Sequence, residues 1–599
     1  MNPTGQPVQL KPNYKILSVL AAVGLVLFLL LQVFPSTASD TLEVQQVNII
    51  SQEKAIESAK AFASDTLVLP DLPAPSVTYH TNAELSGYVA KEKLTQTYMK
   101  KLEKVAPYDV FRVHYPDVGT GDALDIDVHM NTGKVVAFSM YDNQTGASQP
   151  FSLDPTATTE KDESVTLAEK QEQAQPILKA LGFDAGQLTL QTKGNEQDLL
   201  YTAADGKLGD SQLQLKFTYE YGQIRSFQPV LTPPDTYTAY VKEQTALAGW
   251  LTALGYGLFT LVLGVLAIVF GALKRRHTSF KRGIVLSVIY CAISIFSVVN
   301  MWPILVDITL GESNKIVSYV IIGLQLILNI LMAVLLYFSF VGGDGLWRER
   351  GINIWPRSKE IGYGKYVLHS VAVGYLYALI LLGVQSIIYL ILENALGVYS
   401  ATDDTSSPYN MIYPALFPLL AWMAGIGEEA VYRLFGIGML KKLLRNTFVA
   451  CFITTMIWAL GHTLYPIYPI YSRPIELLFI GLLFSFIFLR YGFIAAVFAH
   501  VIFDSILMSL SLISMGGIVN ILLGAFYIVL PAIVAIIIYT FTKNKGVENA
   551  YPPYVPPAPI PQVYYDPTQG QQQYPDHPQQ FQQYSNPVPP SEHDNKPKE

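Results

Sequence analysis

Ten apolar runs, each long enough to cross a lipid bilayer as a helix, constrain this sequence more than any other feature. One lies at residues 16–35 and nine lie between residues 246 and 543. A bilayer offers the backbone no hydrogen-bond partners, so runs of about 20 apolar residues must be helical there. Because 51% of the residues are hydrophobic and only 15% are charged, we predict a polytopic α-helical membrane protein with about ten transmembrane helices. The nine later runs are 246–273, 283–305, 316–341, 366–393, 411–440, 447–465, 474–490, 492–514 and 519–541.

Basic residues flank every second boundary of these runs, which predicts their orientation. We expect residues 1–15 and 546–599 in the cytoplasm, and residues 40–243 outside the cell, in a multi-pass protein of the cell membrane. The loop 394–410 is also expected outside. The basic groups are Lys11 and Lys15, the cluster at 274–282, the cluster at 348–365, Lys441, Lys442 and Arg445, Arg490, and Lys543 and Lys545.

The run at 16–35 is interpreted as an uncleaved transmembrane anchor. A cleaved signal peptide has a shorter apolar core and a cleavage site of small residues. The sequence "STAS" after Pro35 offers such a site, so cleavage is left open.

Residues 40–243 have the mixed polar and apolar pattern of a globular domain. The stretch "SQEKAIESAKAFA" predicts a helix capped by Ser51, and "LDIDVHMNTGKVVAFS" predicts a hairpin that turns at Asn131–Gly133. The second half repeats this plan, with a capping box at Thr166–Glu169 and a hairpin that turns at Gly222. We therefore expect an extracellular α+β domain of two helix-plus-hairpin modules. It resembles the PepSY-type modules of bacterial envelope proteins and fits a role in sensing, in spacing or in binding an extracellular ligand or partner.

The remaining composition excludes several function classes. A formal net charge of -7 gives no sign of nucleic-acid binding. The two cysteines, Cys291 and Cys451, lie in apolar runs and form neither a disulfide framework nor a zinc motif. Residues 546–599 are rich in Pro, Gln and Tyr and cannot build a core, so we predict a disordered cytoplasmic tail.

Three ionisable residues lie in the middle of the apolar run at 411–440. In "AGIGEEAVYRLFGIGML" these are Glu428, Glu429 and Arg433, and each costs roughly 2.5–3.5 kcal/mol at bilayer depth. Glu429 and Arg433 are four residues apart, the spacing of a helical ion pair that could serve packing alone. Glu428 points about 100° away around the helix, so it needs another partner.

Two later runs carry candidate partners for Glu428. "WALGH" contains His462, and "HVIFD" contains His500 and Asp504 on one helical face. From the helical rise, Glu428, His462 and His500 lie roughly 20, 22 and 15 Å from the cytoplasmic ends of their helices. Three helices therefore carry acidic and imidazole groups to a similar depth, as a buried reaction centre requires.

These residue types allow two kinds of hydrolytic chemistry. A carboxylate beside a neutral imidazole can hold and deprotonate a water molecule, and a second imidazole with an Asp can stabilise an oxyanion. Alternatively, Glu, two His and Asp form a ligand set for a divalent metal such as zinc. Both predict amide hydrolysis by water inside the bilayer.

The three motifs together resemble those of the CPBP intramembrane endopeptidases, also called the Abi or CAAX-protease-like family. "EEAVYR" is similar to the EExxxR motif, "WALGH" to FxxxH, and "HVIFD" to Hxxx(Asn/Asp). The resemblance covers mainly residues 411–510, within the membrane domain. It implies that Glu429 and Arg433 support the site. Trp458 stands in place of the motif's Phe and is expected to affect packing only, while Asp504 stands where the best-known eukaryotic members carry Asn.

The resemblance also implies catalytic roles. Glu428 would activate the water together with His462, and His500 with Asp504 would stabilise the oxyanion. An ionised Asp cannot donate a hydrogen bond, so Asp504 would have to be protonated or to orient His500. The glutamic-protease interpretation needs no metal or other cofactor, and we favour it over a zinc-dependent one.

Two other function classes are kept open. A proton- or cation-coupled transporter would use the same cluster as a relay, but the sequence lacks the broken helix pairs and inverted repeat of such proteins. A non-enzymatic scaffold or bacteriocin-immunity protein would keep the cluster without its chemistry, although the intact motifs argue against decay. The expected partners are the bilayer and a membrane-associated protein or peptide substrate, whose identity cannot be read from the sequence.

Overall fold

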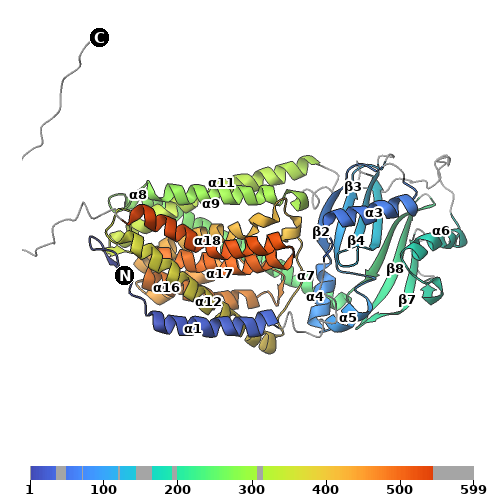
Figure 1. Cartoon of the computed structure of the whole chain (residues 1–599), viewed down its shortest axis with the longest axis horizontal. Helices are drawn as coiled ribbons and strands as arrows, with labels where there is room; N and C mark the ends of the chain where they lie inside the picture. The colour runs from blue at the N-terminus through green and yellow to red at the C-terminus, as the bar shows by residue number, and fades with distance from the viewer. Residues whose placement is uncertain are drawn as a thin grey trace, which may run out of the picture. The chain divides into compact units, whose positions relative to one another are not determined.

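The protein is described here from a computed structural model, which has two parts (Figure 1). The sheet domain comprises the described residues from 49 to 231, and the helical domain comprises residues 2–34 with those from 235 to 543. The predicted tail at 546–599 lies outside the described residues. The structure describes residues 2–34, 49–69, 72–118, 122–142, 165–191, 198–220, 222–305 and 315–543.

The sheet domain contains two similar modules, each with an N-terminal helix and four strands. The first module has α3 (Gln52–Asp65), β2 (Ser76–Thr81), α4 (Ala83–Lys91), α5 (Thr95–Lys101), β3 (Asp109–Tyr115), β4 (Asp122–His129) and β5 (Val135–Asp142). The second has α6 (Leu167–Ala180), the 3₁₀ turn η3 (Ala185–Gln187), β6 (Leu188–Leu190), β7 (Asp198–Leu208), β8 (Ser211–Glu220) and β9 (Gln223–Leu231).

The strands form one antiparallel sheet in the order β2-β3-β4-β5-β9-β8-β7-β6. The two hairpins read from the sequence are β4–β5 and β8–β9, and each belongs to a larger four-stranded unit. The units join through β5 and β9, where Phe138 pairs with Phe227. These two residues follow Gly133 and Gly222, which have positive φ in the two hairpin turns, by the same number of positions. The sheet therefore has approximate twofold symmetry.

The helical domain contains the candidate membrane helices. The elements before residue 400 are α1 (Tyr14–Phe28), the π-helical η1 (Leu29–Val33), α7 (Asp235–Trp250), the π-helical η4 (Leu251–Leu258), α8 (Phe259–Leu273), α9 (Arg282–Asn300), α11 (Lys315–Arg348) and α12 (Tyr363–Leu396). The later ones are the 3₁₀ turns η5 (Pro408–Asn410) and η6 (Pro414–Leu419), α13 (Leu420–Glu428), the π-helical η7 (Glu429–Ile437), α14 (Gly438–Leu444), α15 (Thr447–Leu460), α16 (Ser472–Tyr491), α17 (Phe493–Ser514) and α18 (Ile518–Thr542). Two short ladders pair β1 (Asn2–Pro3) with β10 (Ile352–Asn353) and β11 (Tyr399–Ser400) with β12 (Ile467–Tyr468).

In the described part of the chain, 8 helices are long and apolar enough to cross a membrane. They correspond to all of the predicted runs except 411–440 and 447–465. The first of these is not one α-helix, because Pro414 and Pro418 lie in the 3₁₀ turn η6 and a π-helical segment follows α13. The second ends early, at Leu460. The total of ten spans thus stays a prediction.

Large apolar side chains are exposed along α1, α8, α9, α11 and α18. A soluble protein rarely leaves so much contiguous apolar surface in water, whereas lipid solvates it. The chain is therefore a multi-pass membrane protein. Examples of these exposed side chains are Val19, Val23, Val262, Val285, Ile327, Leu331, Leu522 and Phe541.

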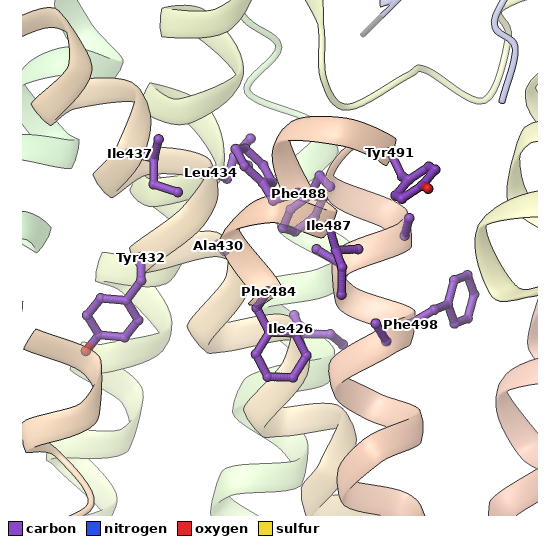
Figure 2. Close-up of a cluster of buried hydrophobic side chains, with 14 of the residues drawn as sticks. Ile426, Ala430, Tyr432, Leu434, Ile437, Phe484, Ile487, Phe488, Tyr491 and Phe498 are labelled. Carbon is purple, nitrogen blue, oxygen red and sulfur yellow. The ribbon is translucent and has the colours of Figure 1, made fainter. Parts of the chain in front are cut away.

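The core of the helical domain lies around α13, η7 and α16. Figure 2 shows Phe484, Ile487 and Phe488 of α16 in one buried cluster with Ile426 of α13 and Ala430 of η7. This packing fixes one side of the helix that carries the acidic pair.

The first apolar segment is an integral part of the helical domain. A Cβ on Gly383 of α12 would overlap the backbone of Gly24 in α1, so the two helices approach as closely as small-residue membrane helix pairs do. The strand β1 ahead of α1 also pairs with β10 in the basic loop after α11.

Hydrogen bonds connect the sheet domain to the loop between α12 and η6. The Asn410 amide bonds to both backbone groups of Tyr79, at 2.6 and 2.8 Å, and Thr402 bonds to Ser86 at 2.8 Å. The same loop contains β11, which pairs with β12 shortly after His462. The sheet domain is thus linked to the region of the polar cluster.

Candidate active site

The two adjacent acids lie where α13 passes into the π-helical η7. Such π-helical turns are uncommon and occur frequently at functional sites. Glu428 ends α13 with its side chain 26% exposed, while Glu429 begins η7 and is fully buried. Neighbouring positions in the chain therefore have different surroundings.

Glu429 forms the predicted ion pair with Arg433 and also holds an imidazole. Its Oε1 lies 3.0 Å from Nη1 of Arg433, and both side chains are fully buried. The same oxygen is 2.8 Å from Nδ1 of His500, which donates to it. The Arg433 guanidinium lies 4.6 Å from the centre of the Trp458 ring, a cation–π contact. Glu429 thus anchors α17 to η7.

Glu428 faces Trp458 and His462. The indole Nε1–H of Trp458 donates a hydrogen bond to Oε2 of Glu428. Nδ1 of His462 lies 3.0 Å from the Trp458 carbonyl oxygen, so Nδ1–H donates there and the lone pair stands on Nε2. That Nε2 is 4.0 Å from Oε1 of Glu428, a separation too long for a direct hydrogen bond and suited to a water between them.

His500 and Asp504 complete the cluster from α17. Nε2 of His500 lies 3.4 Å from Oδ2 of Asp504 and 3.7 Å from Oε2 of Glu428. Its ring stacks on Phe484 with centroids 4.4 Å apart. The structure therefore brings together all the residues that the sequence singled out, from α13, η7, α17 and the turn after α15.

His462 does not lie on a membrane helix, in contrast to its predicted place in the run 447–465. The helix α15 ends at Leu460, and His462 sits in the following turn. Tertiary hydrogen bonds hold this turn: the Thr463 hydroxyl donates to the Ala248 carbonyl at 3.1 Å and lies 2.9 Å from the Thr252 hydroxyl. The turn is therefore attached to the helix that leaves the sheet domain.

The donor types fit the zinc alternative, and the choice between it and the glutamic mechanism stays a prediction. Among the described residues, no group of three or more His, Cys, Asp or Glu side chains is arranged to hold a metal ion.

Sequence reasoning missed two features of the site. The sequence predicts a packing role for Trp458, although its N–H, which the motif's Phe lacks, indicates a hydrogen-bond donor. Tyr256 and Tyr290 line a cavity of about 180 Å³ that also reaches Glu428. They come from helices far from the motifs, so spacing along the chain gave no indication of them.

Comparisons with known proteins concern the same segment. Residues 410–506 match the family model described as type II CAAX prenyl endopeptidase Rce1-like, which confirms the CPBP resemblance there. The sporulation-killing factor biosynthesis protein SkfC of Bacillus subtilis (strain 168) is 28% identical over 89 residues, covering 15% of this chain and 18% of that protein. No solved structure matches the chain. The PepSY-like resemblance of the sheet domain is not confirmed.

Proposed function

We propose that this protein is an intramembrane endopeptidase that hydrolyses peptide bonds of membrane-associated substrates, using a water molecule activated by Glu428 and His462. The observation that carries the proposal is the gap between these two groups, where Oε1 of Glu428 faces Nε2 of His462 at 4.0 Å. The match of residues 410–506 to CAAX prenyl endopeptidases supports the same reaction class.

In this proposal, a water between Glu428 and His462 gives a proton to that pair as its oxygen bonds to the scissile carbonyl carbon. The carbonyl electrons move onto oxygen, and Nε2–H of a protonated His500 donates to this oxyanion. Glu429 at Nδ1 and Asp504 near Nε2 balance the imidazolium charge. When the C=O bond re-forms, the C–N bond breaks and the stored proton passes to the leaving amine.

Asp504 acts here by orienting His500. Its carboxylate oxygen lies 3.4 Å from Nε2 of His500, so the contact requires no proton on Asp504. In this proposal the His500 imidazole is the hydrogen-bond donor to the oxyanion, where an Asn side chain could also donate.

The transporter and scaffold alternatives use the same cluster but give no reason for the gap between Glu428 and His462. A proton relay favours direct hydrogen bonds, and a packing role favours a closed ion pair such as Glu429–Arg433. Neither alternative is supported by an observation of its own.

The test separates chemistry from folding. Glu428→Gln keeps shape and polarity but removes the base, so we expect hydrolysis to fall about 10²–10⁴-fold at unchanged membrane abundance. His462→Ala and His500→Ala should act similarly. Cleavage products would be compared by mass spectrometry of membrane peptides from cells carrying each variant. His369→Ala is the control, because His369 bonds to Tyr14 away from the cluster. Wild-type product patterns in all three site variants would refute the proposal.

In this mechanism the hydrolysis needs no metal ion. The purified full-length protein should therefore keep its activity in EDTA or 1,10-phenanthroline. Inhibition by a chelator that zinc reverses would instead show that the cluster acts through a metal.

A further inference from the structure

A cavity of about 180 Å³ is lined in part by Glu428. One wall is the stripe of α13 and η7 that carries Gly427 and Glu428. Another part of its lining comes from α11, with Leu335 and Ser339. His462, His500, Asp504 and Trp458 are not among its lining residues, so Glu428 is the group that the cavity shares with the proposed catalytic cluster.

The walls of this cavity suit an apolar occupant. Leu335, Leu336, Met332 and Met423 supply carbon surface. The Ser339 hydroxyl donates to the Leu335 carbonyl at 3.0 Å, and is thus engaged within its own helix. The hydroxyls of Thr260 and Tyr432, also in the lining, bond to each other at 2.8 Å. These three hydroxyls are therefore already hydrogen-bonded within the protein.

Two glycines set the limits of the cavity. A Cβ on Gly264 of α8 would lie 2.8 Å from Cδ1 of Leu335, and one on Gly427 would lie 2.7 Å from Cε2 of Tyr290. The helices are therefore already in contact at both points. The space that they leave is about 180 Å³, the size of a pocket for one side chain rather than a groove for an extended chain.

We propose that this cavity is a specificity pocket that receives one large apolar side chain of the substrate, next to the scissile bond, with Leu335 and Ser339 as specificity-determining residues. The inference rests on the proposed endopeptidase function, because a peptide attacked beside Glu428 comes next to the cavity that Glu428 lines. The expected substrates are membrane peptides with a large apolar residue flanking the cleaved bond.

The experiment changes the pocket volume in both directions. Ser339→Leu adds bulk to the cavity, and Leu335→Ala enlarges it. Val334→Leu is the matched control, since Val334 lies on the same helix but is 45% exposed and outside the lining. Full-length variants in phosphatidylethanolamine–phosphatidylglycerol vesicles would be given the membrane-peptide fraction of Glu428→Gln cells. Mass spectrometry would identify the residues on either side of each cleaved bond.

We expect Ser339→Leu to reduce cleavage beside Leu, Ile, Met and Phe at least tenfold relative to cleavage beside Ala, because pocket fits of one methylene discriminate by about 10–200-fold. Leu335→Ala should shift the preference toward Phe and Trp, and Val334→Leu should match the wild type. If both pocket variants still cleave and show the wild-type residues beside the cleaved bonds, the specificity pocket is refuted while the endopeptidase function stands. A change in co-purified lipid without a change in cleavage sites would also refute the pocket and would assign the cavity to an acyl chain. If Glu428→Gln itself yields the wild-type products, the endopeptidase function fails instead.

Discussion

Glu428 and Glu429 are adjacent in the chain, yet burial and partners give them different tasks. Glu429 is fully buried, forms an ion pair with Arg433 and accepts a hydrogen bond from His500. Glu428 is part-exposed and accepts a hydrogen bond from Trp458, with His462 and His500 beyond hydrogen-bond distance. We infer that Glu429 holds the fold of the site and that Glu428 performs the chemistry.

Substitution of Glu429 should therefore affect stability as well as activity. Glu429→Gln leaves the Arg433 guanidinium buried and unpaired, which costs about 3–5 kcal/mol. We expect lower abundance in the membrane fraction and a lower unfolding temperature of the purified protein. Glu428→Gln should leave both quantities near wild type. Equal abundance of the two variants would contradict this division of roles.

Trp458 connects three parts of the site, and Trp458→Phe isolates one of them. The variant keeps an aromatic ring near Arg433 and the carbonyl that holds His462, but removes the N–H that bonds to Glu428. A hydrogen bond to a charged group contributes about 1.5–3 kcal/mol, so kcat should fall by about 10–100-fold with little change in KM.

The matched control for this change is Trp422→Phe. Among the described residues, the Trp422 indole nitrogen has no hydrogen-bond partner. That variant should keep the wild-type kcat. If Trp458→Phe is equally silent, the hydrogen bond to Glu428 is not used in the reaction.

At the scale of elements, the turn after α15 depends on its neighbours for its position. The Thr463 hydroxyl bonds to Ala248 and Thr252, and the amide of Ile470 donates to the Gln244 side chain at 2.9 Å. These partners all lie in the continuous helix of α7 and η4. The placement of His462 is thus a property of two elements rather than of α15 alone.

Thr463→Val tests this attachment. It preserves shape but removes a buried donor, at a cost of about 1–3 kcal/mol. We expect a lower kcat and an altered rate of His462 modification by diethyl pyrocarbonate, measured by mass spectrometry. Thr463→Ser should restore both values. Thr540→Val serves as control, because that hydroxyl donates to the Ile537 carbonyl within its own helix, α18. Unchanged His462 labelling in Thr463→Val would show that the turn is held by other contacts.

At the scale of the whole molecule, two sets of contacts agree with the predicted membrane orientation. The sheet domain bonds to the loop that holds Asn410, which is expected outside, while β1 pairs with β10 in a basic loop expected inside. The sidedness itself is a prediction from the basic residues.

Cysteine labelling of intact cells checks it. Cys291 and Cys451 would first be replaced by Ala, and a single Cys placed at exposed Lys54 or exposed Lys359. A membrane-impermeant maleimide should label the Cys at position 54 in intact cells, and the Cys at position 359 only after permeabilisation. The reverse pattern would invert the topology.

Much of this protein could be predicted from local properties of its sequence. Apolar runs identify membrane helices because each residue contributes its own transfer free energy, and side-chain alternation identifies strands for the same local reason. The Ser51 cap and the Thr166–Glu169 capping box lie where they were expected, since each depends on a few consecutive residues. The acids and imidazoles of the cluster were found because ionisable groups are rare in apolar helices.

Only the tertiary structure decided how these parts meet. The pairing of Phe138 with Phe227 joins two hairpins that no local pattern connects. Trp458 donates a hydrogen bond to Glu428 of another helix. His462 lies in a turn and not in a helix, because Thr463 beside it bonds to the Ala248 carbonyl of α7. Such contacts depend on distances between residues far apart in the chain. A one-dimensional pattern carries no information on those distances until packing brings the elements together.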